Sequence, residues 1–93
     1  MVMISDDARD YLLDHGGAVH LFSTRARLSW GRVDLGPSVR RGVPKNAADY
    51  DFAIVNQIKL YLPRDFDTPS PLTIDLRRLF GIKMLYISGW KLL

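Results

Sequence analysis

Apolar residues occupy every second position in two segments of the second half of the chain, Ile58–Leu62 (IKLYL) and Leu72–Leu76 (LTIDL). A period of two sends successive side chains to opposite faces of a β-strand, so each segment has one face suited to burial. An antiparallel sheet with one solvated face produces this alternation. The second half of the chain is therefore expected to be rich in β-structure.

Further segments in this half extend the β-pattern. Tyr50–Val55 (YDFAIV) precedes IKLYL, and the intervening Asn56-Gln57 predicts a β-hairpin because asparagine tolerates the positive φ of a tight turn. Ile82–Ser88 (IKMLYIS) predicts a final strand, closed by Gly89-Trp90. Between these strands, Arg77–Gly81 (RRLFG) is expected to make one helical or irregular turn.

The N-terminal region predicts a short strand followed by a helix. Val2–Ile4 is apolar, and the hydroxyl of Ser5 can cap a helix over about Asp6–His15. Gly16-Gly17 supplies a flexible end to that helix. One helix face collects the residues at i, i+3, i+4 and i+7 spacing, which are Ala8, Tyr11, Leu12 and His15.

After the helix, Ala18–Thr24 (AVHLFST) predicts a strand that Arg27–Trp30 (RLSW) continues as a second strand or an irregular edge. From Gly31 to Asn46 glycine and proline recur and apolar residues are few. This composition predicts a long loop, and long loops in small domains are often functional or mobile. A functional site is therefore expected within residues 31–46.

Together these elements predict an α+β fold with one N-terminal helix and six or seven short, mainly antiparallel strands, packed as a sandwich or a partly closed barrel. The 93 residues suffice for one domain, residues 1–93. A core of this size is modest and the chain contains no cysteine for a disulfide, so good packing or a partner subunit must contribute to stability. The sequence is compatible both with a homodimer and with binding to a different protein.

The sequence also bears on location. It contains no apolar run of the roughly 18 to 20 residues that a membrane span needs. The N-terminal residues include SDDARD, unlike the basic-then-apolar layout of a secretory signal. The protein is therefore expected in the cytoplasm and away from membranes, and the lack of cysteine agrees with that compartment.

The absence of cysteine also restricts the chemistry, since it excludes a thiolate nucleophile. No elbow motif supports a serine triad with either histidine. His15 is better explained as a helix-end residue that complements the helix dipole, and His20 as a hydrogen-bonded interior residue. Neither metal-ligand spacing nor a phosphate loop is visible. We therefore expect a non-enzyme with no catalytic residue, metal or cofactor.

Positive charge is concentrated in residues 23–48, which hold six cationic side chains against one aspartate. Trp30 lies among them, and cations beside an aromatic residue suit phosphates and stacked bases. One interpretation is a polyanion or nucleic-acid binding module using residues 25–45. The other is a solvated basic loop whose arginines keep an exposed strand from pairing. The cations are Arg25, Arg27, Arg32, Arg40, Arg41 and Lys45.

Six short motifs follow one another along the chain: Ile4–Leu12 (ISDDARDYL), Gly36–Pro44 (GPSVRRGVP), Ile58–Leu62, Leu72–Leu76, Lys83–Leu85 (KML) and Gly89-Trp90. In this order they resemble the CC/Se-motif branch of the HesB-like superfamily, the A-type carriers of iron–sulfur cluster biogenesis. The resemblance covers nearly the whole chain. It implies a β-rich fold with an N-terminal helix.

The resemblance implies a cysteine site that this chain lacks. The branch carries an adjacent Cys-Cys or Cys-selenocysteine pair just ahead of Pro-Ser-Val, where this sequence has WGRVDLGPSV. Because clusters need thiolate or, more rarely, imidazole ligands, we expect a non-catalytic relative that acts through protein contacts and carries no cluster. The candidate binding residues near this position are Trp30, Arg32, Asp34, Ser38, Arg40, Arg41 and Lys45.

Overall fold

The computed structural model describes residues 2–64, 66 and 71–89, with the backbone alone described at 24–28 and 32–35. Within these ranges the protein has a single α-helix, a short 3₁₀ helix and seven strands, which confirms the predicted β-rich α+β class. No helix in this part of the chain is long and apolar enough to cross a membrane. In chain order the elements are β1 (Val2–Ile4), α1 (Asp6–Leu13), β2 (Ala18–Leu28), β3 (Gly31–Arg41), η1 (Ala47–Asp49), β4 (Tyr50–Val55), β5 (Ile58–Pro63), β6 (Leu72–Leu79) and β7 (Ile82–Ser88).

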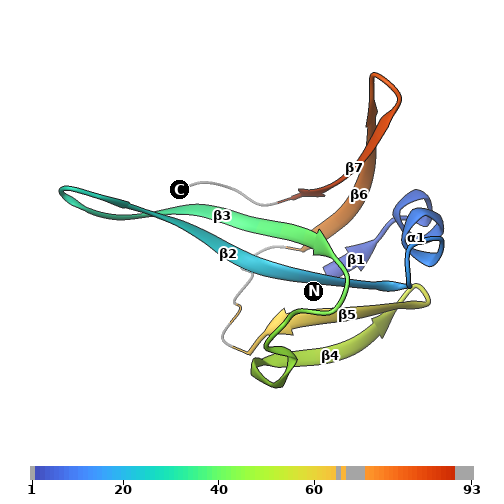
Figure 1. Ribbon diagram of the computed structural model, residues 1–93, viewed down its shortest axis with the longest axis horizontal. Helices are drawn as coiled ribbons and strands as arrows, with labels where there is room; N and C mark the ends of the chain where they lie inside the picture. The colour runs from blue at the N-terminus through green and yellow to red at the C-terminus, as the bar shows by residue number, and fades with distance from the viewer. Residues whose placement is uncertain (1, 65, 67–70, 90–93) are drawn as a thin grey trace.

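The strands form two mixed sheets (Figure 1). One has the order β1-β6-β7, with β1 parallel to β6, and the other has the order β3-β2-β5-β4, with β2 parallel to β5. The remaining neighbours are antiparallel hairpins. Within the described residues the sheets stay separate and form no closed barrel, so of the two predicted packings the sandwich is the nearer.

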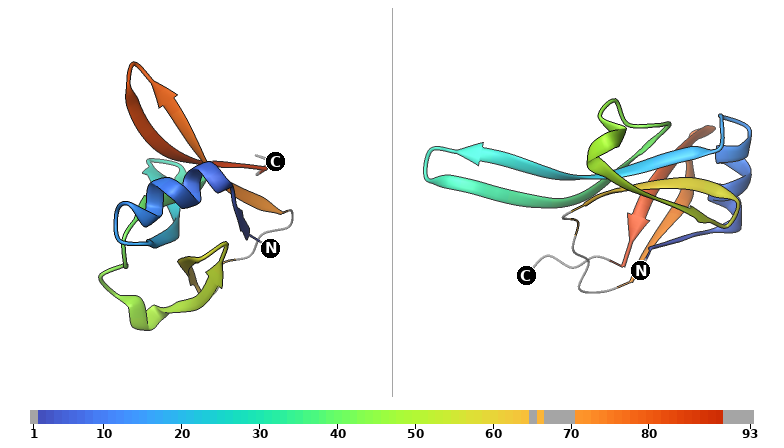
Figure 2. Two further views of the ribbon diagram at one scale, coloured as in Figure 1. Left: turned by 90° about the vertical axis from the view of Figure 1, so that its right-hand side faces the viewer. Right: turned by 90° about the horizontal axis from the view of Figure 1, so that it is seen from below.

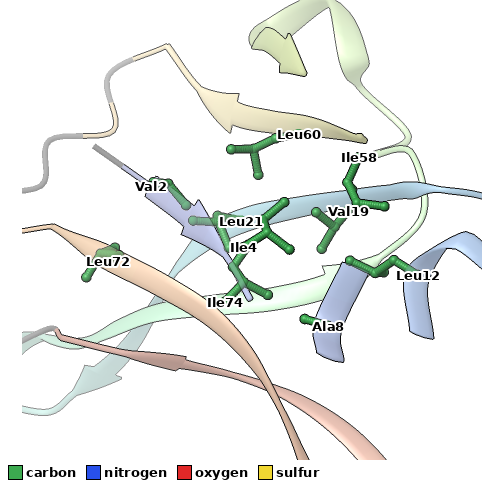
Figure 3. Packing of buried hydrophobic residues seen from close by; sticks show 10 residues of the cluster. All are labelled: Val2, Ile4, Ala8, Leu12, Val19, Leu21, Ile58, Leu60, Leu72 and Ile74. Carbon is green, nitrogen blue, oxygen red and sulfur yellow. The ribbon is translucent and has the colours of Figure 1, made fainter. Parts of the chain in front are cut away.

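The core lies between the two sheets, and α1 covers one end of it (Figure 2). Figure 3 shows side chains from both sheets and from α1 pointing toward one another. Alternation explains the set, because β5 and β6 contribute every second residue, as their sequence pattern requires. The buried cluster is Val2, Ile4, Ala8, Leu12, Val19, Leu21, Ile58, Leu60, Leu72 and Ile74.

Helix α1 begins as predicted and ends earlier than predicted. Ser5 is the N-cap, and its hydroxyl accepts from the backbone N–H of Ala8 at 3.2 Å. The helix ends at Leu13 rather than at His15. His15 lies in the following turn, where its Nδ1 is 2.7 Å from the carbonyl oxygen of Tyr11. His15 therefore interacts with the C-terminal end of the helix from outside it.

The predicted loop at residues 31–46 is wrong over residues 31–41, which form β3 and pair with β2 along its length. Residues 42–46 do form a loop. Proline is tolerated here because β3 is an edge strand, where Pro37 needs no partner on its outer side. A register shift between Thr24 and Arg25 absorbs the irregularity. The resulting hairpin projects from the body of the protein (Figures 1 and 2). The radius of gyration of 13.7 Å accordingly exceeds the value of about 12 Å for a compact domain of this length.

The turns of the other two hairpins gave one correct and one wrong prediction. Asn56 and Gln57 connect β4 to β5 with φ of 48° and 71°, which confirms the predicted tight turn. Arg77–Gly81 is mostly strand, since β6 continues to Leu79 and Phe80-Gly81 makes a two-residue turn with φ of 51° and 78°. Trp90, predicted to close the last strand, lies outside the described residues.

Candidate functional site

A groove with a volume of about 460 Å³ lies between β2, the end of β3 and the segment that leads into β4. It forms because the chain leaves β3 at Gly42, where φ is 99°, and passes in front of the sheet before β4 begins. The groove is lined by His20, Phe22, Arg40, Arg41, Val43, Pro44, Lys45, Asn46 and Tyr50.

His20 is the buried polar residue of the groove, with 9% of its surface exposed. Its Nδ1 is 2.9 Å from the carbonyl oxygen of Gly42. A carbonyl oxygen can only accept, so Nδ1 carries the proton and Nε2 of the neutral ring carries a lone pair. Among the described side chains no nitrogen or oxygen is both fully buried and unpartnered. Nε2, for which no partner is found in this part of the chain, is therefore accessible from the groove.

Arg40 and Arg41 point to opposite faces of the sheet, as neighbours in a strand do. Arg40 pairs with His20 in the β2–β3 register and so shares its face. The Cζ of Arg40 lies 5.4 Å from the centre of the Phe22 ring. Arg41 rests on α1, with Cζ 5.8 Å from the ring centre of Tyr11 and Nη1 donating to the Tyr11 hydroxyl at 3.3 Å. Arg40 is thus the arginine that faces into the groove, and Arg41 forms part of its edge.

The far wall of the groove is held by contacts within the segment before β4. Tyr50 meets the His20 ring edge-on, with ring centres 6.1 Å apart. The Nδ2 of Asn46 donates to the Asp49 carboxylate at 3.2 Å. The described residues that line the groove include the cations Arg40, Arg41 and Lys45 and no carboxylate. Its potential is therefore expected to favour an anion.

The structure brings together some of the predicted site residues and separates others. Arg40, Arg41 and Lys45 line the groove. Ser38 lies next to it on β3, opposite Phe22. Trp30 is 75% exposed in the turn of the β2–β3 hairpin, and ten strand residues from Arg40 correspond to about 30 Å. For Arg32 and Asp34, on β3 near that turn, only the backbone is described.

Sequence reasoning missed the contribution of β2 to this site. His20 was predicted to be a hydrogen-bonded interior residue, and its bond to Gly42 confirms this, but it also faces the groove. The alternation in AVHLFST places His20 and Phe22 on the face opposite Val19 and Leu21, which are buried. That alternation was the available signal. Tyr50 gave no signal, because its approach to His20 depends on the path of the chain after β3.

A second exposed surface lies at the end of the β6–β7 hairpin, which projects from the body on the side away from the β2–β3 turn (Figure 1). Phe80, in the turn, is 94% exposed and Ile82 is 62% exposed. Two cationic residues, Arg78 and Lys83, pair with each other in the strand register near the same turn. We refer to this surface as the apolar hairpin end, defined by Leu79, Phe80, Ile82 and Met84.

Comparison with known proteins identifies the family. A family model described as the CC/Se motif containing family matches residues 1–90. The chain belongs to this family. No curated protein and no solved structure matches it. The family is named for a CC/Se motif, whereas none of the 93 residues of this chain is cysteine.

The residues present do not fit an iron–sulfur cluster. The Gly36–Val39 (GPSV) segment of this CC/Se family member lies on β3, paired with β2 between the groove and the hairpin turn. Thiolates are absent from the sequence, and among the described residues no group of three or more His, Cys, Asp or Glu side chains converges. Its two histidines point their Nδ1 atoms at backbone carbonyls of different elements. The described residues therefore offer a cluster neither thiolates nor a converging pair of imidazoles.

Proposed function

We propose that this protein is a non-catalytic, cysteine-less relative of the HesB-like proteins of iron–sulfur biogenesis, acting through protein contacts and carrying no cluster itself. Support for the relationship is the order of sequence motifs together with the β-rich fold and N-terminal helix. Support for the mode of action is the apolar hairpin end. A cytoplasmic location is part of the proposal, since a cysteine-free protein suits a reducing compartment.

The observation that carries the proposal is the conformation of Phe80. Its φ is 51° and its side chain is 94% exposed, in a two-residue turn whose second residue is Gly81. Positive φ costs an ordinary residue about 1 kcal/mol or more, and turns of this kind prefer asparagine at that position. Phe80 recovers nothing by burial. A residue whose backbone conformation is unfavourable and whose side chain packs against no part of the core is best explained by contact with another molecule.

The charge around the apolar hairpin end indicates the kind of partner. Arg77, Arg78 and Lys83 lie on the hairpin, and residues 76–89 contain no acidic side chain. Two copies joined through this surface would therefore oppose like charges, which disfavours a symmetric homodimer here. We propose a different protein, with an apolar surface bordered by carboxylates.

The protein-contact proposal is tested by replacing the turn residue. Phe80→Asn gives the preferred Asn-Gly turn, so the fold should be at least as stable while the aromatic contact is lost. With a photo-crosslinking amino acid at position 82 in cells, the wild-type chain should capture one partner that Phe80→Asn fails to capture. Equal capture by Phe80→Asn, or capture only of a second copy of the chain, would contradict the proposal.

The claim that the protein carries no cluster has its own test. The purified protein, incubated anaerobically with iron and sulfide and then desalted, should stay colourless. A visible absorbance that remains bound to the protein would show that other side chains hold a cluster. That result would remove this part of the proposal.

A second candidate function is binding of a polyanion or nucleic acid, favoured by the clustering of Arg40, Arg41 and Lys45 around one groove. Single-stranded RNA or DNA should then bind more weakly as salt rises. Replacing Arg40 and Arg41 by alanine should lower the affinity and flatten that salt dependence, as followed by a fluorescence titration. An unchanged titration would assign these arginines to a solvated surface.

A further inference from the structure

We propose that the groove binds a small phosphate monoester, held by His20, Arg40 and Lys45. The inference rests on the second candidate function, because both need an anion on this basic segment. It differs in the ligand, which is a single small molecule here and not a polymer. It does not depend on the apolar hairpin end, which lies on another sheet.

The first step is the state of His20. His20 as a whole is 9% exposed, and its ring is fixed by the hydrogen bond from Nδ1 to the carbonyl oxygen of Gly42. Its Nε2 has no partner among the described residues and opens onto the groove. Because Nε2 is accessible from the groove, it is free to hydrogen-bond to a ligand, while the rest of the ring is already held in place. A ligand group that completes this hydrogen bond would therefore be favoured at this position.

The second step is the choice of anion. Phosphate monoesters lose their second proton near pH 6, so near neutral pH a bound monoester and an imidazole can share one proton. Either a phosphate O–H donates to Nε2 or a protonated Nε2 donates to the phosphate. Both arrangements satisfy the two groups with the same number of protons. A sulfate ester has no such proton. Its oxygens can only accept, so they would face the lone pair on Nε2 of a neutral His20 without a hydrogen bond.

The third step is charge. Arg40 lies on the same sheet face as His20, and its guanidinium is held over Phe22 at 5.4 Å. Lys45 lines the groove on the segment after β3. With one proton shared between them, His20 and the monoester together carry a net single negative charge. Arg40 and Lys45 stabilise that charge, and charge-assisted hydrogen bonds are the strong ones. The nearby carboxylate of Asp49 is occupied in accepting from Asn46 at 3.2 Å.

The fourth step is size. The volume of about 460 Å³ falls within the range of roughly 300 to 1,000 Å³ that is usual for small-molecule sites. Phe22 and Tyr50 add apolar surface for the organic part of the ester. Single-stranded nucleic acid instead needs an extended track of stacking residues. The groove dimensions therefore favour one small ligand.

The experiment compares four probes by calorimetry with the full chain, at neutral pH and low ionic strength. The probes are inorganic phosphate, phenyl phosphate, phenyl sulfate and a short single-stranded RNA. We expect phenyl phosphate to bind most tightly, because it supplies both the charge and the ring. Phenyl sulfate should bind at least about tenfold more weakly, since one charge-assisted hydrogen bond is lost.

Two substitutions locate the binding and two others serve as controls. His20→Asn keeps an amide that can donate to Gly42 but removes Nε2, and Arg40→Ala removes an exposed side chain without disturbing the core. Each should weaken phenyl phosphate binding by about tenfold. His15→Asn and Arg78→Ala, which change the same residue types outside the groove, should leave it unchanged. Circular dichroism verifies that each variant is folded, and Arg40→Ala keeps the test decisive if His20→Asn unfolds.

The outcomes separate this inference from the functions proposed above. Equal binding of phenyl sulfate, or no binding of either phosphate, would overturn it. RNA binding that depends on Arg40 without binding of phenyl phosphate would also overturn it, while preserving the second candidate function. Loss of phenyl phosphate binding in His15→Asn or Arg78→Ala would place the ligand elsewhere and overturn it as well. Phe80→Asn should bind phenyl phosphate normally whatever its effect on protein contacts.

Discussion

The side-chain amide of Asn56 donates to the carbonyl oxygen of Ile4 across 2.8 Å, which ties the β4–β5 turn to the end of β1. The same amide donates to the Asp6 carboxylate at 3.0 Å, and its oxygen accepts from Arg9 at 3.2 Å. With a φ of 48°, Asn56 therefore forms the β4–β5 turn of one sheet. Its side chain also holds β1, which belongs to the other sheet, and α1.

Replacing Asn56 by glycine separates these two roles. Glycine keeps the backbone conformation without strain but removes all three hydrogen bonds, so the free energy of unfolding should fall by about 1 to 3 kcal/mol. Urea denaturation measures the change. Gln57→Gly is the matched control, because Gln57 is exposed with a φ of 71° and its side chain makes no hydrogen bond to the described residues. Glycine there relieves strain and should raise stability by up to about 1 kcal/mol. Equal losses at both positions would show that the Asn56 side chain contributes nothing beyond the turn.

Asp75 gives stability a predictable dependence on acid. Its carboxylate accepts from the backbone N–H of Leu76 at 2.8 Å and from the Ser5 hydroxyl at 2.8 Å. These bonds, with a weaker one from Tyr86, hold the pKa of Asp75 below its usual value, although burial opposes them. The folded pKa is thus lower than the unfolded one. The stabilisation is complete above the unfolded pKa and is lost as the pH falls through the folded pKa.

The variant Asp75→Asn should make this contribution visible. The amide cannot ionise, so the variant should be less stable than the wild type near neutral pH and should lose less stability on acidification toward pH values below the ordinary aspartate pKa of about 4. Urea midpoints at neutral and acidic pH measure the difference. Asp14→Asn is the control, since Asp14 is exposed at the C-terminal end of α1. Parallel pH profiles for wild type and Asp75→Asn would contradict the assignment.

The same substitution should cost far more stability at a core leucine than at a leucine of the hairpin end. Leu21 is fully buried between the sheets, whereas Leu79 is 53% exposed. Leu21→Ala should lower the free energy of unfolding by about 2 to 5 kcal/mol, because it leaves a cavity. Leu79→Ala should change it by less than about 1 kcal/mol, since little apolar surface is lost from the core. A large loss for Leu79→Ala would mean that the apolar hairpin end is structural and would weaken the case for partner contact.

Local chemistry was sufficient to predict the elements whose stabilising contacts are near in sequence. Ser5 caps α1, and Asn56 forms its turn, because each uses groups within a few residues. The segment at residues 31–41 could not be recognised as a strand. Its glycines and Pro37 resemble a loop, and only the position of β3 at a sheet edge makes them compatible with pairing. The two-residue turn at Phe80-Gly81 was missed for a similar reason, because phenylalanine rarely adopts the positive φ that this turn requires.

The candidate site was predicted in part for a related reason. Arg40, Arg41 and Lys45 are close in sequence, so charge clustering found them. His20 joins them through β2–β3 pairing, and Tyr50 through the path of the chain before β4. Neither contact has a local cause. The groove depends on the same β2–β3 hairpin that the sequence presented as a loop. Its three cations were therefore predicted, whereas the contributions of His20, Phe22 and Tyr50 were not.

Gly89 provides a test of how closely β7 approaches the start of β6. Its φ is 94°, and a Cβ on this residue would lie 2.5 Å from the carbonyl oxygen of Pro71. Gly81, in the β6–β7 turn, has a φ of 78° and nothing within 4 Å of a Cβ. Gly81→Ala should therefore cost only backbone strain, about 1 to 2 kcal/mol. Gly89→Ala adds a backbone collision that no side-chain movement can relieve, so it should cost about 1 to 3 kcal/mol more. Urea denaturation of the two variants measures the difference. If they lose the same stability, the chain at Pro71 yields without cost and the close approach does not hold the end of β7 in place.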